Sequence, residues 1–268
     1  AVADSTDPTE FKLMLFPSQV HKISSLISLM CHQRDLLQRL QALHRQSNVP
    51  MSRHFEWQSQ LHYQYMEEDK TVQIQCAEST FDYGFEYVGS ADREVVTPAT
   101  ERMFHSLTQT LAQHTAGLCM APSGSNQMAT IEELSRCLGR PLYTVNCTQT
   151  LGSHMLNDIF RGYASTGSWL CFNNLSNVPP PVLSVLSQLL QSVSDAQRAE
   201  KNCLTLQSEE IPLKPSCACF GVVSTAIAVS AHNPEKLLSF NSAAARLPDS
   251  LLSQFRMVGV VTPDLKLL

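Results

Sequence analysis

Between residues 18 and 47, apolar residues recur every three or four positions among polar ones. This spacing places them on one side of a helix, so it predicts a single long amphipathic helix that packs by that face. A coiled coil with a partner helix is the alternative. Asn48-Val49-Pro50 ends the pattern, because the residue before a proline disfavours helical backbone. The apolar face holds Ile23, Leu26, Ile27, Met30, Leu37, Leu40 and Leu43.

The following stretch is rich in aromatic and β-branched residues, in the runs FEWQSQLHYQY, TVQIQCAEST and FDYGFEYVGS. These residue types favour strands. We therefore expect short strands over residues 55–80, with turns at Glu67-Glu68-Asp69 and near Gly84.

From Val95 onward, apolar strand-like segments alternate with helical patterns. Thr97-Pro98 is typical of a helix start, with threonine as the N-cap and proline in the first turn. A second helix should stop at Gly139, and a third should follow the proline run at 179–181. Buried strands separated by helices predict an α/β protein with a largely parallel sheet. The five expected strands are 116–121, 142–147, 168–174, 217–224 and 255–262.

The charge balance argues against two classes of function. The 268 residues carry 19 basic and 24 acidic side chains, a formal net charge of −5. A nucleic-acid-binding surface needs clustered Lys and Arg, as does a polybasic membrane anchor. The longest apolar stretch, residues 217–231, is shorter than the ~20 residues of a membrane span. We therefore expect neither a nucleic acid nor a membrane as partner.

The nine cysteines form no C-x-x-C pair, and the nine histidines show no ligand spacing. These patterns favour reduced thiols and predict no metal site. Cys147 and Cys171 fall on expected buried strands, so we expect core roles and not nucleophiles for them. Because the chain starts at Ala1 without a signal peptide pattern, we expect a segment of a longer, cytoplasmic protein.

Charged residues are missing from two long stretches, 103–131 and 162–194. The first includes a turn between a buried strand and a helix, which is where a phosphate-binding loop would lie. Such a loop needs the pattern G-x-x-x-x-G-K-[S/T]. Residues 121–128 instead read APSGSNQM, which puts Asn126 at the second glycine, Gln127 at the lysine and Met128 at the hydroxyl.

The second uncharged stretch contains the strand WLCFNN at 169–174. A nucleotide-hydrolysing site would end this strand in Asp-Glu, one to hold Mg²⁺ and one to polarise water. Asn173 and Asn174 keep the size but lose the anion, so they bind Mg²⁺ poorly and cannot accept a proton. Glu132 and Glu133, on the expected solvated side of a helix, are not expected to be catalytic.

At this point the sequence resembles the dynein heavy chains, most of all divergent members with a degenerate nucleotide site. The resemblance runs colinearly from about residue 11 to 265. It rests on FEWQSQL at 55–61, FDYGFEYVG at 81–89, VVTPATER at 95–102, PSCA at 215–218 and LPDSL at 247–251, ahead of Phe255-Arg256.

The resemblance implies a fold and a division of the chain. It implies an α/β, P-loop NTPase (AAA+) three-layer domain with a parallel five-stranded sheet, preceded by a helix and a small β region from the dynein linker. Residues 1–80 would be the C-terminal end of the linker. Residues 81–268 would be the large subdomain of the first AAA+ module, with the lid subdomain absent.

The resemblance also implies site residues. Arg256 falls where the family places an arginine finger toward a neighbouring site, with an ordinary ion-paired arginine as the alternative. Ser224 falls at the sensor position, although an insertion around 226–242 blurs that alignment. The segment that approaches adenine would be Val96, Thr97 and Pro98, and the phosphate-loop turn would be Pro122, Ser123, Gly124, Ser125, Asn126, Gln127 and Met128.

Taken together, these residues predict a motor-ring module that does not hydrolyse ATP and acts as a structural or regulatory part. Weak binding of ATP or ADP stays open, and Mg²⁺ binding is not expected. The alternative is an ATP-binding module in an active microtubule motor whose hydrolysis resides elsewhere. By resemblance, the partners are other AAA+ modules of the same chain, dynein light or intermediate chains and microtubules, in the cytoskeleton or in the axoneme of a cilium or flagellum.

Overall fold

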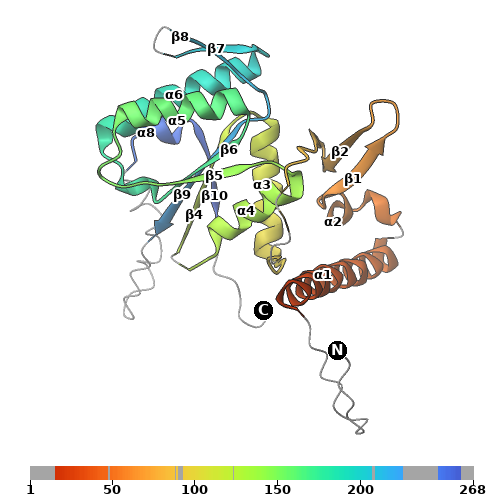
Figure 1. The fold of residues 1–268 in the computed structure, drawn as a ribbon. Helices are drawn as coiled ribbons and strands as arrows, with labels where there is room; N and C mark the ends of the chain where they lie inside the picture. The colour runs from red at the N-terminus through yellow and green to blue at the C-terminus, as the bar shows by residue number, and fades with distance from the viewer. Residues whose placement is uncertain are drawn as a thin grey trace, which may run out of the picture.

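The computed structural model describes residues 16–47, 49–87, 89, 93–122, 124–206, 209–225 and 247–260. The N-terminal region begins with the long helix α1 and continues into a small antiparallel sheet of order β1-β2-β3 (Figure 1). Its elements are α1 (Pro17–Ser47), η1 (Met51–Arg53), α2 (Phe55–Gln58), β1 (His62–Met66), β2 (Thr71–Cys76) and β3 (Ser79–Asp82).

Two predictions for this region are wrong in part. Residues 55–58 form the single helical turn α2 instead of a strand, because the amides of Trp57 and Gln58 both donate to the carbonyl of His54. The apolar face of α1 also does not pack as a whole. Of the seven predicted face residues, Leu40 is buried, whereas Leu26, Ile27 and Met30 remain 54–60% exposed.

The rest of the chain forms the predicted α/β domain. Its sheet is fully parallel, in the order β10-β4-β9-β6-β5. The strands are β4 (Ala116–Pro122), β5 (Leu142–Asn146), β6 (Trp169–Asn173), β9 (Ala218–Thr225) and β10 (Phe255–Gly259). The helices are α3 (Pro98–Ala112), α4 (Gln127–Leu138), α5 (Ser153–Thr166), α6 (Pro180–Arg198) and α8 (Asp249–Leu252), with the 3₁₀ turn η2 (Leu175–Asn177).

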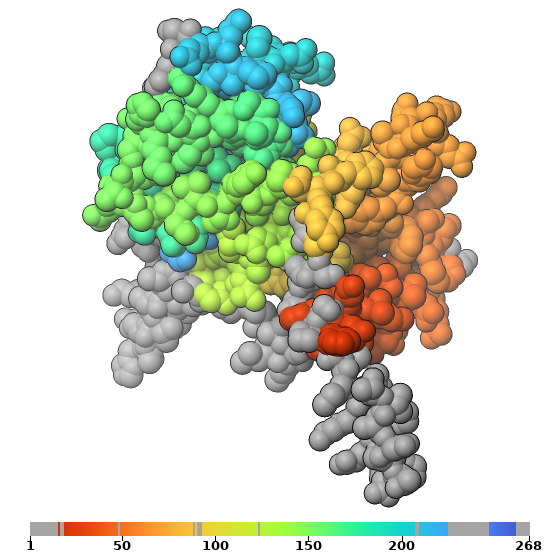
Figure 2. Space-filling model, in the orientation of Figure 1, coloured from red at the N-terminus to blue at the C-terminus, as the bar shows by residue number. Residues whose placement is uncertain are grey.

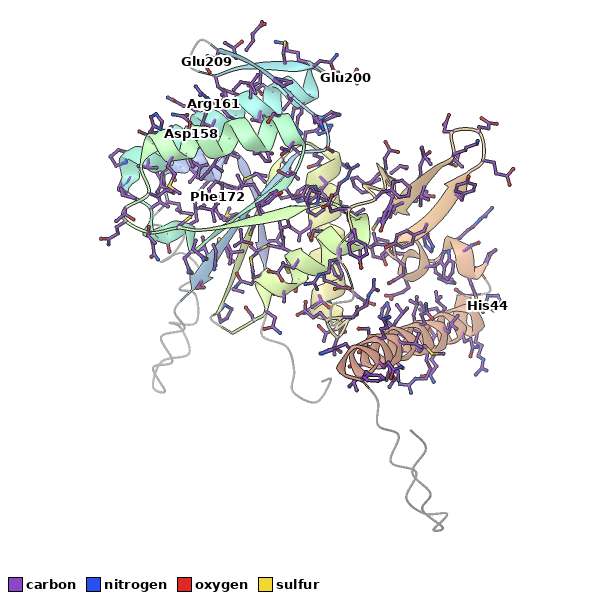
Figure 3. The ribbon with its side chains drawn as sticks, in the orientation of Figure 1. His44, Asp158, Arg161, Phe172, Glu200 and Glu209 are labelled. Atoms are coloured by element: carbon purple, nitrogen blue, oxygen red, sulfur yellow. The ribbon has the colours of Figure 1, made fainter. Side chains whose placement is uncertain are left out.

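Helices cover both faces of this sheet, which makes three layers (Figure 1). The alternation of side chains along each strand explains the division. Leu118 and Phe172 belong to the core under α5, α6 and α8, where Figure 3 labels Phe172. Cys119 and Cys171, one residue away, belong to the second core, under α3 and α4. The α/β fold with a parallel sheet, expected from the strand pattern, is confirmed, as are the three layers that the resemblance implies.

Some elements of the α/β domain were not foreseen. Helix α5 was not recognised separately, and neither was the hairpin of β7 (Cys203–Leu206) and β8 (Glu209–Pro212). The hairpin lies at one end of the domain, where Arg161 of α5 forms an ion pair with Glu209 at 2.9 Å (Figure 3). Each strand of the hairpin has only four residues, and no glycine or proline marks the turn between them, so the sequence pattern does not predict it.

The N-terminal region lies against one side of the α/β domain (Figure 2). Ile74 of β2 is fully buried in the core cluster that contains Met103 and Leu107 of α3. The backbone after β3 also bonds to the end of α4, where the amide of Gly84 donates to Leu138 and that of Glu86 to Gly139, each at 2.9 Å. β3 itself spans residue 80, so the division of the chain at residues 80/81 remains a prediction.

Neither a membrane-spanning helix nor a cluster of metal ligands is found among the described residues. No helix among them combines the length and apolar character needed to cross a bilayer. Nor do the described residues bring together three or more potential metal ligands. The insertion expected around 226–242 lies outside the described residues.

Candidate nucleotide site

The turn between β4 and α4 contains two residues with positive φ. Gly124 has φ +88° and Asn126 has φ 51° and ψ 27°, both in the left-handed region. Asparagine adopts this region more readily than other non-glycine residues, so it replaces the second glycine at small cost. Helix α4 then starts at Gln127, with its N-terminal amides at the turn. Ser123 lies outside the described residues.

Gln127, in the lysine position, turns back into the loop. Its side chain is buried, with 6% of the residue exposed, and its Nε2 donates to Ser125 Oγ at 3.2 Å. The Ser125 hydroxyl in turn donates to the carbonyl of Pro122 at 2.7 Å. Among the described residues, the Oε1 of Gln127 finds no hydrogen-bond partner. A neutral amide with an unpaired acceptor cannot neutralise phosphate as a lysine would.

Met128 occupies the position where a hydroxyl would bind Mg²⁺. Its side chain is half-buried, and its sulfur accepts a weak hydrogen bond from Cys171 Sγ at 3.6 Å. A thioether is a soft ligand, whereas Mg²⁺ takes hard oxygen ligands. Burial raises the pKa of the Cys171 thiol well above its ordinary value, which favours the neutral form. Met128 and Cys171 therefore extend the apolar core toward the site and add no metal ligand.

The two asparagines at the end of β6 have separate roles. Asn173 Nδ2 donates to Asn146 Oδ1 at 3.1 Å, across adjacent parallel strands that pair these two residues in register. Asn174 has φ 57° and starts the turn η2. Asn146 was missed in the sequence, although its place at the carboxyl end of an expected strand was the available signal. The Asn173 amide is thus engaged by a neutral partner.

Ser224 lies at the same edge of the sheet. It is exposed on β9 and pairs in register with Ala121 of β4, at the entrance to the phosphate-loop turn. The register therefore brings Ser224, Asn173 and the turn together at the carboxyl ends of three neighbouring strands. This is where ligands bind in open α/β sheets.

Arg256 lies at the opposite edge. It pairs in register with Gly117 at the start of β4, and its Nη2 donates to Gln109 Oε1 at 2.8 Å. It lines a groove of about 1170 Å³ together with Phe55 and Trp57 from the N-terminal region. The structure therefore does not bring Arg256 to this chain's own phosphate-loop turn. Its role toward a neighbouring module remains a prediction.

The segment before α3 carries the residues that were expected near adenine. Thr97 is buried and caps α3 in a reciprocal capping box with Thr100. Val96 is half-buried and Pro98 is exposed. A few residues earlier, Arg93 pairs with Glu133 of α4 at 3.3 Å. The segment is thereby placed beside the first turns of α4.

Glu94, which the sequence pattern did not single out, faces the phosphate-loop turn. Thr130 Oγ1 donates to its carboxylate at 3.2 Å, and the Asn126 side chain also bonds it. Burial raises the pKa of this carboxyl, partly offset by the two hydrogen bonds. An ionised Glu94 beside the turn would repel phosphate, so it is a further feature that weakens the site for polyphosphates.

One prediction about this helix is wrong. Glu133 was expected on the solvated side of α4, but its side chain is only 6% exposed. Packing of the segment before α3 covers it, and Arg93 and Arg136 pair with its two oxygens, at 3.3 Å and 3.5 Å. A buried carboxylate with two cationic partners is a structural ion pair in this position.

The residues present fit only part of what bound nucleotide requires. The left-handed turn and the start of α4 offer backbone amides to a phosphate group. Gln127 and Met128 supply no positive charge for phosphate, and Asn173 offers Mg²⁺ a neutral amide oxygen in place of an anionic ligand. When bound, ATP with Mg²⁺ would supply a phosphoryl group for transfer to water.

The family described as the hydrolytic ATP binding site of the dynein motor region matches residues 83–268. The chain belongs to the dynein heavy-chain family. The Chlamydomonas reinhardtii protein "Dynein beta chain, flagellar outer arm" is 34% identical over 92% of this chain, and mouse "Dynein axonemal heavy chain 1" is 31% identical over 90%. Pig "Dynein axonemal heavy chain 11" is 29% identical over 95%. The chain spans about 5% of the length of these dyneins.

The expected family and the AAA+ fold are therefore confirmed. The described parallel sheet and the helices that cover it are consistent with this fold. The matched region includes Gln127, Met128, Asn173, Asn174 and Ser224.

Proposed function

We propose that this chain is a dynein motor-ring module that does not hydrolyse ATP and serves as a structural or regulatory part of an axonemal dynein-like protein. The observation that carries the proposal is Gln127, a buried neutral amide in the lysine position that bonds its own loop. Met128 and Asn173 support it, because neither replaces an Mg²⁺ ligand. Removal of one preorganised electrostatic group typically costs about 10²–10³ in rate, so several losses at one site leave negligible turnover.

Residual nucleotide binding without magnesium is part of the proposal. The phosphate-loop turn and the start of α4 keep the amides that bind phosphate, whereas the groups that bind Mg²⁺ are missing. We expect weak binding of ADP and ATP that does not depend on Mg²⁺. Glu94 should disfavour the more highly charged ATP relative to ADP.

A second candidate function is an ATP-binding module within an active microtubule motor whose hydrolysis takes place in other AAA+ modules. The similarity to axonemal dyneins favours it, since their names place them in cilia or flagella. The proposed location is the axoneme. The proposed partners are other ring modules, microtubules and the light or intermediate chains of a dynein.

The test is calorimetric titration of the 268-residue chain with ADP and ATP, with and without Mg²⁺. For the wild type we expect weak heats that Mg²⁺ does not change. Gln127→Lys should tighten binding about tenfold or more, because a charge-assisted hydrogen bond to phosphate contributes about 1.5–3 kcal/mol. Gln113→Lys, which adds the same charge at the exposed C-cap of α3, at the amino end of β4, is the control.

Tight Mg²⁺-dependent binding by the wild type, with ATP turnover that Asn173→Ala abolishes, would overturn the proposal. Tight binding that requires Mg²⁺ but gives no turnover would favour the second candidate function.

A further inference from the structure

Helix α1 makes little apolar contact with the rest of the molecule. Of its described side chains, only Leu36 and Leu40 are buried. Ile27, Met30 and Leu37 remain 50–60% exposed. The apolar area that Leu36 and Leu40 bury is small, and apolar burial has no preferred direction. These contacts therefore do not fix the position of α1 tightly. A second, directional contact is needed to fix where the helix lies.

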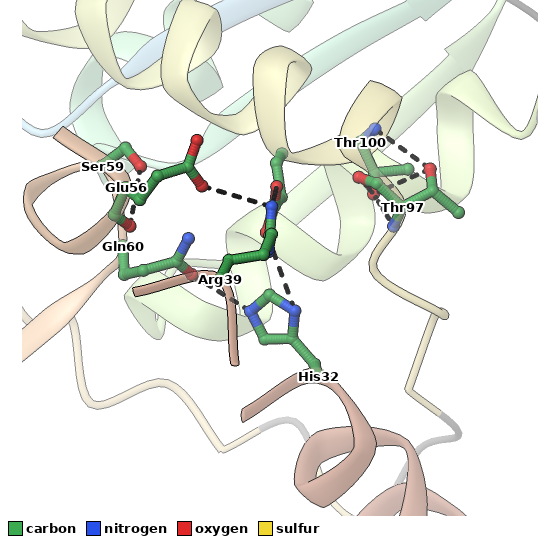
Figure 4. A network of polar contacts seen from close by, with 8 residues as sticks. His32, Arg39, Glu56, Ser59, Gln60, Thr97 and Thr100 are labelled. Atoms are coloured by element: carbon green, nitrogen blue, oxygen red, sulfur yellow. Dashed lines mark hydrogen bonds and ion pairs between the residues drawn. The ribbon is translucent and has the colours of Figure 1, made fainter. Parts of the chain in front are cut away.

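That contact is a polar network centred on Arg39 (Figure 4). Its Nη2 donates to Glu101 Oε1 at 2.8 Å and its Nη1 to Glu101 Oε2 at 3.1 Å, which is the bidentate arrangement. Nη1 also donates to Glu56 Oε2 at 3.2 Å. Arg39 therefore joins α1 to the first turn of α3 and to α2 at once. Paired, two-point geometry of this kind fixes orientation as well as distance.

His32, almost two turns earlier on α1, adds a second link to Glu101 and a contact with Gln60, which follows α2 (Figure 4). Its Nε2 lies 3.1 Å from Gln60 Oε1, and its Nδ1 lies 3.8 Å from Glu101 Oε1. Glu101 thus receives contacts from two positions on α1. Its side chain is only 19% exposed, so loss of Arg39 would leave a largely buried carboxylate near that of Glu56. The two carboxylates would then repel each other and disfavour the position of α1 against α2 and α3.

The site of attachment gives the network a mechanical consequence. Glu101 follows the α3 capping box of Thr97 and Thr100 by one residue. Glu94, three residues before that N-cap, bonds the first turn of α4 through Thr130. A force on α1 would therefore reach the start of α3 and the segment beside the phosphate-loop turn through a short series of polar contacts.

We infer that Arg39 is a positioning residue that clamps α1 to the N-terminus of α3, so that breaking this contact releases α1 while the α/β domain stays folded. The inference rests on the contacts of α1 and does not depend on whether the phosphate-loop turn binds nucleotide. The clamp consists of one guanidinium, that of Arg39, shared by the carboxylates of Glu101 and Glu56. It determines where α1 lies.

The chain supplies its own labelling sites for a test. Cys31 on α1 and Cys203 on β7 are exposed, and the other seven cysteines are buried. Spin labels on these two residues report the distance between α1 and the far end of the α/β domain by pulsed electron paramagnetic resonance. The wild type should give one narrow distance distribution. Arg39→Gln and Glu101→Gln should each give a broader distribution with a shifted mean, and the double variant should add nothing further.

Arg34→Gln is the matched control. It removes the same charge from the same helix, but Arg34 pairs at 2.8 Å with its neighbour Asp35, so the wild-type distribution should be kept. Distributions of Arg39→Gln and Glu101→Gln that match those of the wild type and Arg34→Gln would overturn the inference.

A salt series covers the case in which a variant loses its fold, which far-UV circular dichroism detects. Rising NaCl should broaden the wild-type distribution as it screens the partly exposed ion pairs, while the dichroism stays constant. A wild-type distribution that is unchanged at high salt would contradict a clamp of this kind.

Discussion

Gly84 offers a direct test of how the segment after β3 is joined to the α/β domain. A Cβ atom placed at Gly84 would collide with the carbonyl oxygen of Gly139 and approach the Arg140 side chain. The arginine can move aside, but the carbonyl cannot, because it accepts the amide of Glu86 at 2.9 Å. Gly84→Ala must therefore shift backbone and weaken contacts between this segment and the end of α4.

The magnitude follows from the bonds at risk. The amides of Gly84 and Glu86 donate to Leu138 and Gly139. Each such hydrogen bond contributes about 0.5–1.5 kcal/mol net, so losing both costs about 1–3 kcal/mol. Replacement of glycine in the unfolded chain recovers about 0.4–1 kcal/mol. We expect Gly84→Ala to lower the free energy of unfolding by about 1–2 kcal/mol, on these estimates.

Gly162→Ala is the matched control. Gly162 lies exposed in the interior of α5, and no atom would lie within 4 Å of an added Cβ. The same substitution should here stabilise the protein by about 0.5–1 kcal/mol through helix propensity. Urea unfolding followed by far-UV circular dichroism measures both variants. If Gly84→Ala were as stable as the wild type while Gly162→Ala gained stability, the close approach described above would be refuted.

Two further predictions concern ionisable groups. Burial raises the pKa of Glu94 above its ordinary value of 4.5. Ionisation of Glu94 therefore lowers the free energy of unfolding as the pH rises through and above that value. Glu94→Gln, which cannot ionise, should be more stable than the wild type at pH 7. The difference should vanish in thermal unfolding at pH below about 4, and a pH-independent difference would contradict this cause. Burial raises the pKa of Cys137 to about 11 and that of Cys147 to about 12, so a thiol reagent at pH 8 should quickly modify only Cys31 and Cys203 in the native chain. Rapid reaction of more than two thiols would argue against the buried placement.

Local patterns foretold much of the fold because they act over a few residues. Thr97 and Pro98 marked the start of α3, since capping and a fixed φ are properties of the first turn. Gly139 marked the end of α4, where it adopts φ 61°. The apolar runs marked five strands, although their ends moved by one to three residues.

Other features depended on which segments meet in three dimensions. The 55–58 segment has strand-like composition but forms a turn of helix, in which Phe55 packs edge-on against His105 of α3, with ring centroids 5.3 Å apart. Glu133 has the helical position of a surface residue, yet Arg93 from another segment covers it. No pattern within either segment carries that information, since the partner lies far away in the chain.

The sequence by itself determined the chemistry that the candidate site lacks. Gln127, Met128 and Asn173 carry no positive charge, and in any packing their thioether and neutral amides bind Mg²⁺ less well than a hydroxyl or a carboxylate would, because these limits lie in the functional groups themselves. Tertiary structure alone decided what these residues do instead, what faces them, and how α1 is held. Glu94 beside the phosphate-loop turn and Arg39 on Glu101 both arise from contacts across long chain separations, which only the packed arrangement of layers and helices brings within bonding distance.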